Sequence, residues 1–108
     1  MPLRVNAMND DHAIRHIVVR GRVQGVGFRA FVEDRAVVLG VEGWVRNRRD
    51  GAVEAVFAGP IAAVERVIEA CRAGPRHARV EALDQREGTE AELGWRESGV
   101  TFVCLPTA

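Results

Sequence analysis

The chain has 108 residues and a mass of 11.8 kDa, which is the size of one domain and enough to bury a core. Hydrophobic residues make up 47% of the sequence and charged residues 28%, which argues against a wholly disordered chain, a collagen-like fibre or a disulfide scaffold. Fifteen basic and fifteen acidic residues cancel to a net charge of +0, so the overall charge does not favour a nucleic-acid partner.

All fifteen basic residues are arginines. The absence of lysine excludes a Schiff-base lysine, a lysine general base and a phosphate-binding P-loop, whose motif requires lysine. Cys71 and Cys104 are far apart and form no metal-ligand pattern, which favours free thiols in a reducing compartment. No apolar run has the length of a signal-peptide core or a membrane span, so we expect a cytoplasmic protein without a membrane partner.

Residues 1–13 show no hydrophobic periodicity and are predicted to form a flexible arm, followed by one domain over residues 14–108. From Arg15 a β-branched run predicts the first strand. A glycine-rich loop, Gln24–Gly27, follows it. From Phe28 to Leu39 the apolar residues lie three or four positions apart, which predicts a helix.

Val41–Asn47 alternates apolar and polar residues and predicts a second strand. Asp50-Gly51 is a strong hairpin signal, and Ala52–Ala58 supplies the returning strand. Gly59-Pro60 then opens a second helix, which Gly74-Pro75 ends.

Ala78–Leu83 predicts a fourth strand, Arg86–Gly99 a polar loop and Val100–Leu105 a final strand. The order is therefore βαββαβ. Since connections between parallel strands through helices are right-handed, both helices pack on one face of an antiparallel sheet. This is the ferredoxin-like sandwich of the α+β class.

The glycine-rich loop joins a predicted strand directly to a predicted helix. Successive backbone N–H groups in such a loop can converge into a nest that suits an anion, and a helix N-terminus adds unpaired donors and the positive end of its dipole. Arg29 stands in or beside the first helical turn, where a cation is disfavoured by about 0.3–1 kcal/mol. Its planar fork could bind two phosphate oxygens. Alternatively, the glycines only allow a tight turn and Arg29 is a solvated surface charge.

Asn47 ends the second predicted strand, directly before the hairpin turn. A turn asparagine ordinarily hydrogen-bonds the local backbone. The functional alternative is a neutral amide that holds a water beside a bound phosphoryl group. Arg46, Arg48 and Arg49 surround it as a basic cluster, which either attracts anionic substrates or belongs to a solvated hairpin.

Two blocks of the sequence carry a resemblance to a known family. Gly21–Arg29 (GRVQGVGFR) is followed by Gly43–Asn47 (GWVRN) and then by Asp50–Glu54 (DGAVE), with eighteen positions between the final arginine of the first block and the final asparagine of the second. In order and spacing, over about residues 16–103, these blocks resemble the signature of the acylphosphatase family. A glycine loop alone is a weak signal, whereas the blocks together are highly specific.

The resemblance implies a small enzyme, free of metal and cofactor, that hydrolyses the carboxyl–phosphate bond of small-molecule acyl phosphates and has the ferredoxin-like fold. Arg29 would bind the phosphoryl group, and Asn47 would position the attacking water. The other substrate contacts would be backbone amides, those of Gly25, Val26, Gly27 and Phe28. Two features depart from the family pattern: Arg48 stands where a small hydroxyl residue often follows the asparagine, and the tail after Phe102 lacks a basic-aromatic ending. We expect a monomer with no nucleic-acid partner.

The remaining chemistry-bearing residues are weaker candidates because they lack metal-ligand spacing or nucleophile-elbow glycines. Those expected at the surface, in solvent or at an edge are His12, His16, His77, Ser98, Glu33 and Asp34. Trp44 and Trp95 are predicted to be core or edge aromatics rather than base-stacking platforms.

Two alternatives to an active enzyme remain open from the sequence. RNA-recognition domains share the βαββαβ order, but their central strands present stacking aromatics, and the third strand here has a single aromatic, Phe57. The other alternative is a catalytically idle acylphosphatase-like domain that serves a larger carbamoyl-transfer machine.

Overall fold

The computed structural model describes residues 12–96 and 101–108. Of the predicted arm, residues 1–11 lie outside the described part of the chain, as do Ser98 and Val100, whereas His12 and Ala13 begin the first strand. The helices and strands are β1 (His12–Arg22), α2 (Phe28–Leu39), β2 (Glu42–Asn47), β3 (Val53–Pro60), α3 (Ile61–Ala73), β4 (Arg79–Glu87), α4 (Glu90–Leu93) and β5 (Phe102–Cys104).

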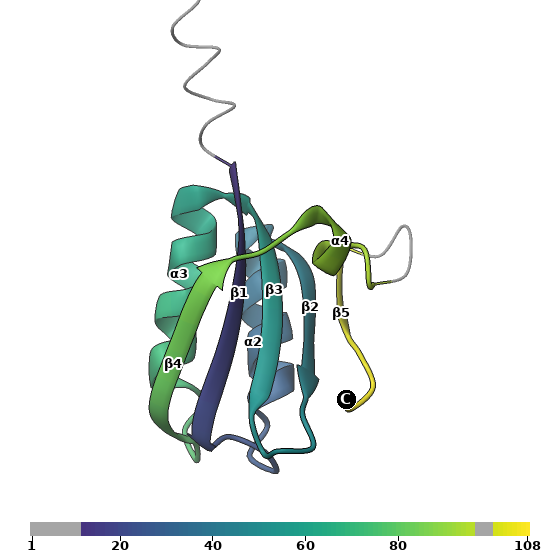
Figure 1. Ribbon diagram of the computed structural model, residues 1–108. Helices are drawn as coiled ribbons and strands as arrows, with labels where there is room; N and C mark the ends of the chain where they lie inside the picture. Colours follow the sequence, from purple (N-terminus) through teal and green to yellow (C-terminus); the bar gives the residue numbers. More distant parts are fainter. Residues whose placement is uncertain (1–11, 97–100) are drawn as a thin grey trace, which may run out of the picture.

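The five strands form one sheet in the order β4-β1-β3-β2-β5 (Figure 1). β1 pairs antiparallel with β3 and β4, and β3 pairs antiparallel with β2, so the predicted ferredoxin-like sheet is confirmed for these four strands. The sheet is mixed rather than antiparallel throughout, because β5 pairs parallel with β2. The chain leaves β4, crosses one end of the sheet through α4 and enters the opposite edge at the end where β2 begins (Figure 1).

Both long helices cover one face of the sheet, as predicted (Figure 1). α2 has the predicted bounds and ends at Gly40, whose φ of 71° is left-handed. The helices and strands share a core of fully buried apolar side chains, among them Val32, Ala36, Val64 and Val67 from the helices and Ile17, Val19, Val45, Ala55 and Phe57 from the sheet. Burial of this apolar surface holds α2, and with it the start of that helix, in a fixed position on the sheet.

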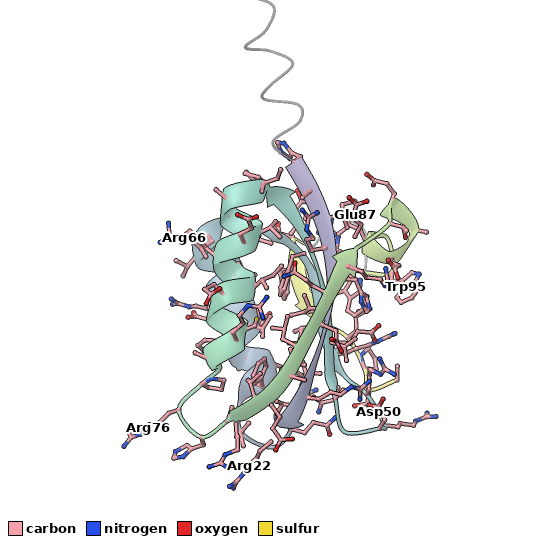
Figure 2. All side chains as sticks on the ribbon, turned by 60° about the vertical axis from the view of Figure 1, so that its left-hand side comes forward. Arg22, Asp50, Arg66, Arg76, Glu87 and Trp95 are labelled. Atoms are coloured by element: carbon pink, nitrogen blue, oxygen red, sulfur yellow. The ribbon has the colours of Figure 1, made fainter. Side chains whose placement is uncertain are left out.

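The opposite face of the sheet carries α4 and Trp95, which lie on the far side from α3 in Figure 2. The predicted loop over 86–99 is wrong in two respects. β4 continues to Glu87, and α4 is a short helix whose capping box joins the side chains of Thr89 and Glu92 to each other's backbone N–H groups. The sequence predicts the strand itself over Ala78–Leu83, but its charged, exposed continuation to Glu87 lacks the apolar alternation that marks a half-buried strand and is therefore missed.

The expectation that His16 lies at the surface or at an edge is also wrong, because its side chain is buried. It is 6% exposed, and its Nε2 lies 2.7 Å from Oε2 of Glu54, which is 8% exposed. Arg46 Nε donates to the other oxygen of the same carboxylate over 2.8 Å. Trp44 is fully buried beside this group, and its Nε1 donates to the carbonyl of Glu92 in α4 over 2.7 Å. The sheet face opposite the two long helices therefore carries a buried polar network, and α4 covers part of it.

Candidate active site

The loop between β1 and α2 has the geometry of an anion nest. Gly25 and Gly27 have φ angles of 74° and 80°, and Val26 between them has a negative φ, because no non-glycine residue of the described chain has a positive one. This alternation turns successive N–H groups toward one side. A Cβ atom on either glycine would meet nothing within 4 Å. Glycine is therefore required here for its backbone conformation and not for lack of space.

The first turn of α2 adds free donors to this nest. Gly27 is the N-cap residue, so no side chain caps the helix, and the first turn holds no acidic residue. Arg29 lies in that turn as predicted, is exposed, and has no ion-pair partner in the part of the chain that the structure describes. Unpaired N–H groups, the positive end of the dipole and a free guanidinium are thus concentrated at one point.

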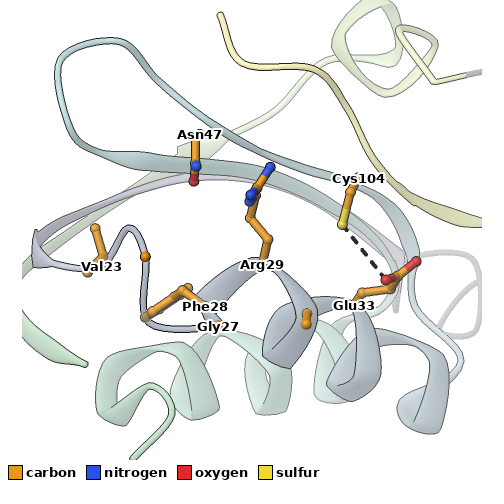
Figure 3. Close-up of a pocket in the computed structure, with 9 residues that line it drawn as sticks. Val23, Gly27, Phe28, Arg29, Glu33, Asn47 and Cys104 are labelled. Atoms are coloured by element: carbon orange, nitrogen blue, oxygen red, sulfur yellow. Dashed lines mark hydrogen bonds between the residues drawn. The ribbon is translucent and has the colours of Figure 1, made fainter. Parts of the chain in front are cut away.

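A pocket of about 370 Å³ opens between this helix start and the sheet (Figure 3). Arg29 reaches upward from α2 between Asn47 and Cys104, and the Gly27–Phe28 segment closes one end (Figure 3). The residues that line the pocket are Val23, Gly25, Gly27, Phe28, Arg29, Ala30, Glu33, Asn47 and Cys104. All the predicted site residues except Val26 are among them. The side chain of Val26 instead packs against the core, which leaves only its backbone N–H available to a ligand.

Asn47 comes from the last position of β2, where the sheet holds it opposite the loop (Figure 3). Its backbone carbonyl accepts from the N–H of Ala108 over 3.0 Å. The side-chain Oδ1 is buried and has no hydrogen-bond partner among the described residues. A buried polar atom without a partner is uncommon in folded proteins and calls for an explanation. An acceptor aimed into a pocket that suits an anion can hold a water molecule there.

Glu33 and Cys104 are pocket residues that the sequence analysis did not assign to the site, and the expectation that Glu33 is a solvated surface residue is wrong, because it is half-buried in the pocket lining. Glu33 stands one helical turn after Arg29, and the thiol of Cys104 in β5 donates to its Oε1 over 3.8 Å (Figure 3). Burial, together with the Glu33 carboxylate, raises the pKa of the Cys104 thiol. The i, i+4 spacing of Arg29 and Glu33 could have placed both on one face of the helix. The position of Cys104 could not be predicted, because it depends on the pairing of β5.

Within residues 12–96 and 101–108, no three His, Cys, Asp or Glu side chains lie close enough to hold a metal ion. Burial raises the pKa of the Cys71 thiol to about 12, so this cysteine is an inert core residue rather than a nucleophile. None of the described helices is long and apolar enough to cross a membrane.

Fold and site together define a ferredoxin-like domain with a donor-rich pocket at the start of α2. The acylphosphatase family model matches residues 15–94. An acylphosphatase of Rhodopseudomonas palustris strain BisB18 is 56% identical over 87% of this chain and 95% of its own length, and one of Nitrobacter hamburgensis is 55% identical over 90% and 98%. The crystal structure of the Bacillus subtilis acylphosphatase superposes with a TM-score of 0.74, at 36% identity over 85% of this chain and 97% of that one.

The chain belongs to the acylphosphatase family, the hydrolases that cleave acyl phosphates into a carboxylate and phosphate. The family, the fold and the enzyme class expected from the two sequence blocks are confirmed.

Proposed function

We propose that Arg29, the N–H groups of the Gly25–Phe28 loop and the start of α2 bind the phosphoryl group of the acyl phosphate, while Asn47 orients the water that attacks it. The observation that carries the water-positioning role is the buried, unpartnered Oδ1 of Asn47, which faces the pocket across from the loop. Support for phosphoryl binding comes from the positive φ angles of the two loop glycines and from the Arg29 guanidinium, which pairs with no carboxylate of residues 12–96 and 101–108.

Phosphoryl transfer depends mainly on positioning and on stabilising the charge of the transferring group. The arginine fork and the loop amides neutralise the three outer oxygens, and the Asn47 Oδ1 accepts one hydrogen of the water, so that its lone pair is directed at phosphorus. The P–O bond to the acyl group then breaks, and the carboxylate leaves without needing a strong acid. Glu33 points to Cys104 and away from Asn47 (Figure 3), so the proton of the water passes to a phosphate oxygen of the substrate.

A phosphate-release assay with a simple aryl acyl phosphate, run with a chelator present, tests the reaction. We expect full turnover, because the pocket offers no set of metal ligands within the described chain. Loss of turnover on chelation would contradict a metal-free mechanism. Failure to cleave any acyl phosphate would instead favour the idle-domain alternative.

Inorganic phosphate tests the binding half of the proposal, since it is a product of the reaction. We expect it to inhibit competitively and, in a soaked crystal, to contact Arg29 and the amides of the Gly25–Phe28 loop. Phosphate bound elsewhere, with this loop empty, would contradict the assignment of the phosphoryl site.

We further propose a monomer in the cytoplasm that acts on small acyl phosphates and binds no nucleic acid. Both cysteines are free thiols, one buried and one exposed, as expected in a reducing compartment. Light scattering of the purified chain and fractionation of the source cells would check these two points.

A further inference from the structure

The side chain of Gln24 joins the two parts of the site. Gln24 is the residue before the nest, and its Nε2 donates to the carbonyl of Arg48 over 2.7 Å and to the carbonyl of Ala52 over 2.9 Å. Arg48 directly follows Asn47, and Ala52 faces it across the hairpin, where the Arg48 N–H donates to the Ala52 carbonyl over 2.8 Å. The side-chain amide of Gln24 therefore donates two hydrogen bonds to backbone carbonyls at the base of the hairpin that carries Asn47.

Other hydrogen bonds of this hairpin join it to itself or, through the backbone of Asn47 and Arg49, to the C-terminal residue Ala108, and none of these reaches the Gly25–Phe28 loop. The Asp50 carboxylate accepts from the Ala52 N–H over 3.0 Å, and its other oxygen lies 2.9 Å from Nη2 of Arg48. The pairing of Val19 with Val53 and the ion pair of Arg20 with Asp50, 3.5 Å long, hold the hairpin beside β1. The two bonds of Gln24 span 24 and 28 residues of sequence and tie the hairpin to the residue directly before the Gly25–Phe28 loop.

We infer that Gln24 is a positioning residue for hydrolysis: it holds the Asn47 amide at the right distance from a phosphoryl group bound in the loop. The inference rests on the proposed role of Asn47 and extends it to a residue that touches neither substrate nor water. An amide suits this role because the two targets are both carbonyl oxygens, and a side chain that donates twice and carries no charge matches them. A misplacement of about 1 Å at a reacting centre can reduce the rate by as much as 10²-fold.

The Gln24→Met variant keeps the length of the side chain and removes both donors. We expect kcat to fall about tenfold, since the hairpin keeps its shape and its place beside β1 but loses the two hydrogen bonds that tie it to the loop. The inhibition constant of inorganic phosphate should change by less than about twofold, since Arg29 and the loop amides are untouched. Gln85, the other glutamine of the chain, is exposed on β4, and Gln85→Met serves as the matched control with unchanged kcat.

The decisive measurement places Gln24→Met in an Asn47→Ala background. If Gln24 acts through Asn47, the second substitution causes no further loss of kcat, because the group that it positions is already gone. Losses that multiply, or phosphate inhibition that weakens as much as kcat/KM, would overturn the inference, because Gln24 would then act on the loop. Gln24→Glu, which keeps the side-chain shape but places an ionised oxygen against two carbonyls, should lose at least as much kcat as Gln24→Met.

The failure of this inference is distinguishable from failure of the proposed mechanism. Collapse of kcat in Asn47→Ala together with normal kcat in both Gln24 variants would overturn the positioning role alone. Normal kcat in Asn47→Ala would overturn the water-positioning role, and the role of Gln24 with it. Circular dichroism and phosphate inhibition show in each case that the variant is folded and that its loop is intact.

Discussion

Two arginines of the site region, Arg29 and Arg46, have opposite surroundings. Arg29 is exposed at the start of α2, against the helix dipole, and pairs with no carboxylate of the described residues. Arg46 has a side chain that is 20% exposed, donates to Glu54 over 2.8 Å and lies 4.9 and 5.1 Å from the ring centres of Trp44 and Trp95. One guanidinium is left free for a ligand, whereas the other is neutralised and stacked inside the protein.

On the proposed role of Arg29, this difference separates phosphoryl binding from stability. A cation in the first turn of a helix is unfavourable by about 0.3–1 kcal/mol until an anion binds beside it. A charge-assisted hydrogen bond such as that of Arg46 contributes about 1.5–3 kcal/mol, and stacking on an aromatic ring adds to it. We therefore expect substitutions at Arg29 to change catalysis with little change in stability, and substitutions around Arg46 to do the reverse.

Arg29→Lys has the largest expected effect. It keeps the charge but loses the fork, and a point charge cannot hold two phosphate oxygens in a fixed geometry. We expect kcat/KM to fall on the order of 10³-fold, equivalent to about 4 kcal/mol of transition-state stabilisation. Steady-state kinetics measure the loss, and an unchanged thermal unfolding curve shows that the fold is intact. Arg46→Lys is the matched control. An equal loss of kcat/KM in that variant would show that Arg29 and Arg46 do not differ in their importance for catalysis.

Arg46→Leu should unfold more readily with little loss of kcat. It leaves the Glu54 carboxylate with His16 as its remaining partner, so we expect a loss of about 2 kcal/mol, below the ~3–5 kcal/mol for breaking a fully buried pair. Urea unfolding followed by circular dichroism measures the free energy of unfolding. A stability equal to that of the unsubstituted chain would show that the network contributes nothing.

The pH dependence of the free energy of unfolding tests the contribution of Glu54, the carboxylate that pairs with Arg46. Burial alone would raise the pKa of Glu54, but the hydrogen bonds from His16 and Arg46 outweigh it and hold this pKa below the ordinary 4.5. A lowered pKa in the folded state stabilises the protein above 4.5, and this stabilisation is lost as the pH falls through the folded-state pKa. The stability advantage of the unsubstituted chain over Glu54→Gln should therefore be present near neutral pH and shrink as the pH falls below 4.5. A constant advantage would contradict the shift.

Trp95→Ala has the smallest expected effect. Trp95 is 51% exposed and stacks on Trp44 with ring centres 5.6 Å apart. Such a pair contributes about 0.5–1.5 kcal/mol, so we expect a loss of about 1 kcal/mol and an unchanged kcat. Val38→Ala, at an exposed position of α2, should shift stability by less than about 0.5 kcal/mol. Equal changes in the free energy of unfolding of the two variants would show that the stacking of Trp95 on Trp44 and Arg46 contributes no more to stability than an ordinary surface side chain.

What could be predicted from the sequence depended on how local the signal was. The bounds of α2 follow from its apolar spacing and the glycines at its two ends, and Arg29 could be placed because the first turn lies next to the loop. The Thr89–Glu92 capping box was also local and could have revealed α4 within the predicted loop. The register of β1 on β3 is not a local property, so the contact of His16 with Glu54, 38 residues away, could not be predicted.

The use of arginine at all fifteen Lys and Arg positions matters for an enzyme that acts on acyl phosphates. Acyl phosphates are activated acyl donors, and the uncharged amine of a lysine can capture the acyl group as a stable amide. A guanidinium stays protonated at any physiological pH and does not attack, so Arg29 can sit against the substrate without becoming acylated. With no lysine anywhere in its 108 residues, the chain offers no side-chain amine to the reactive compounds that it binds.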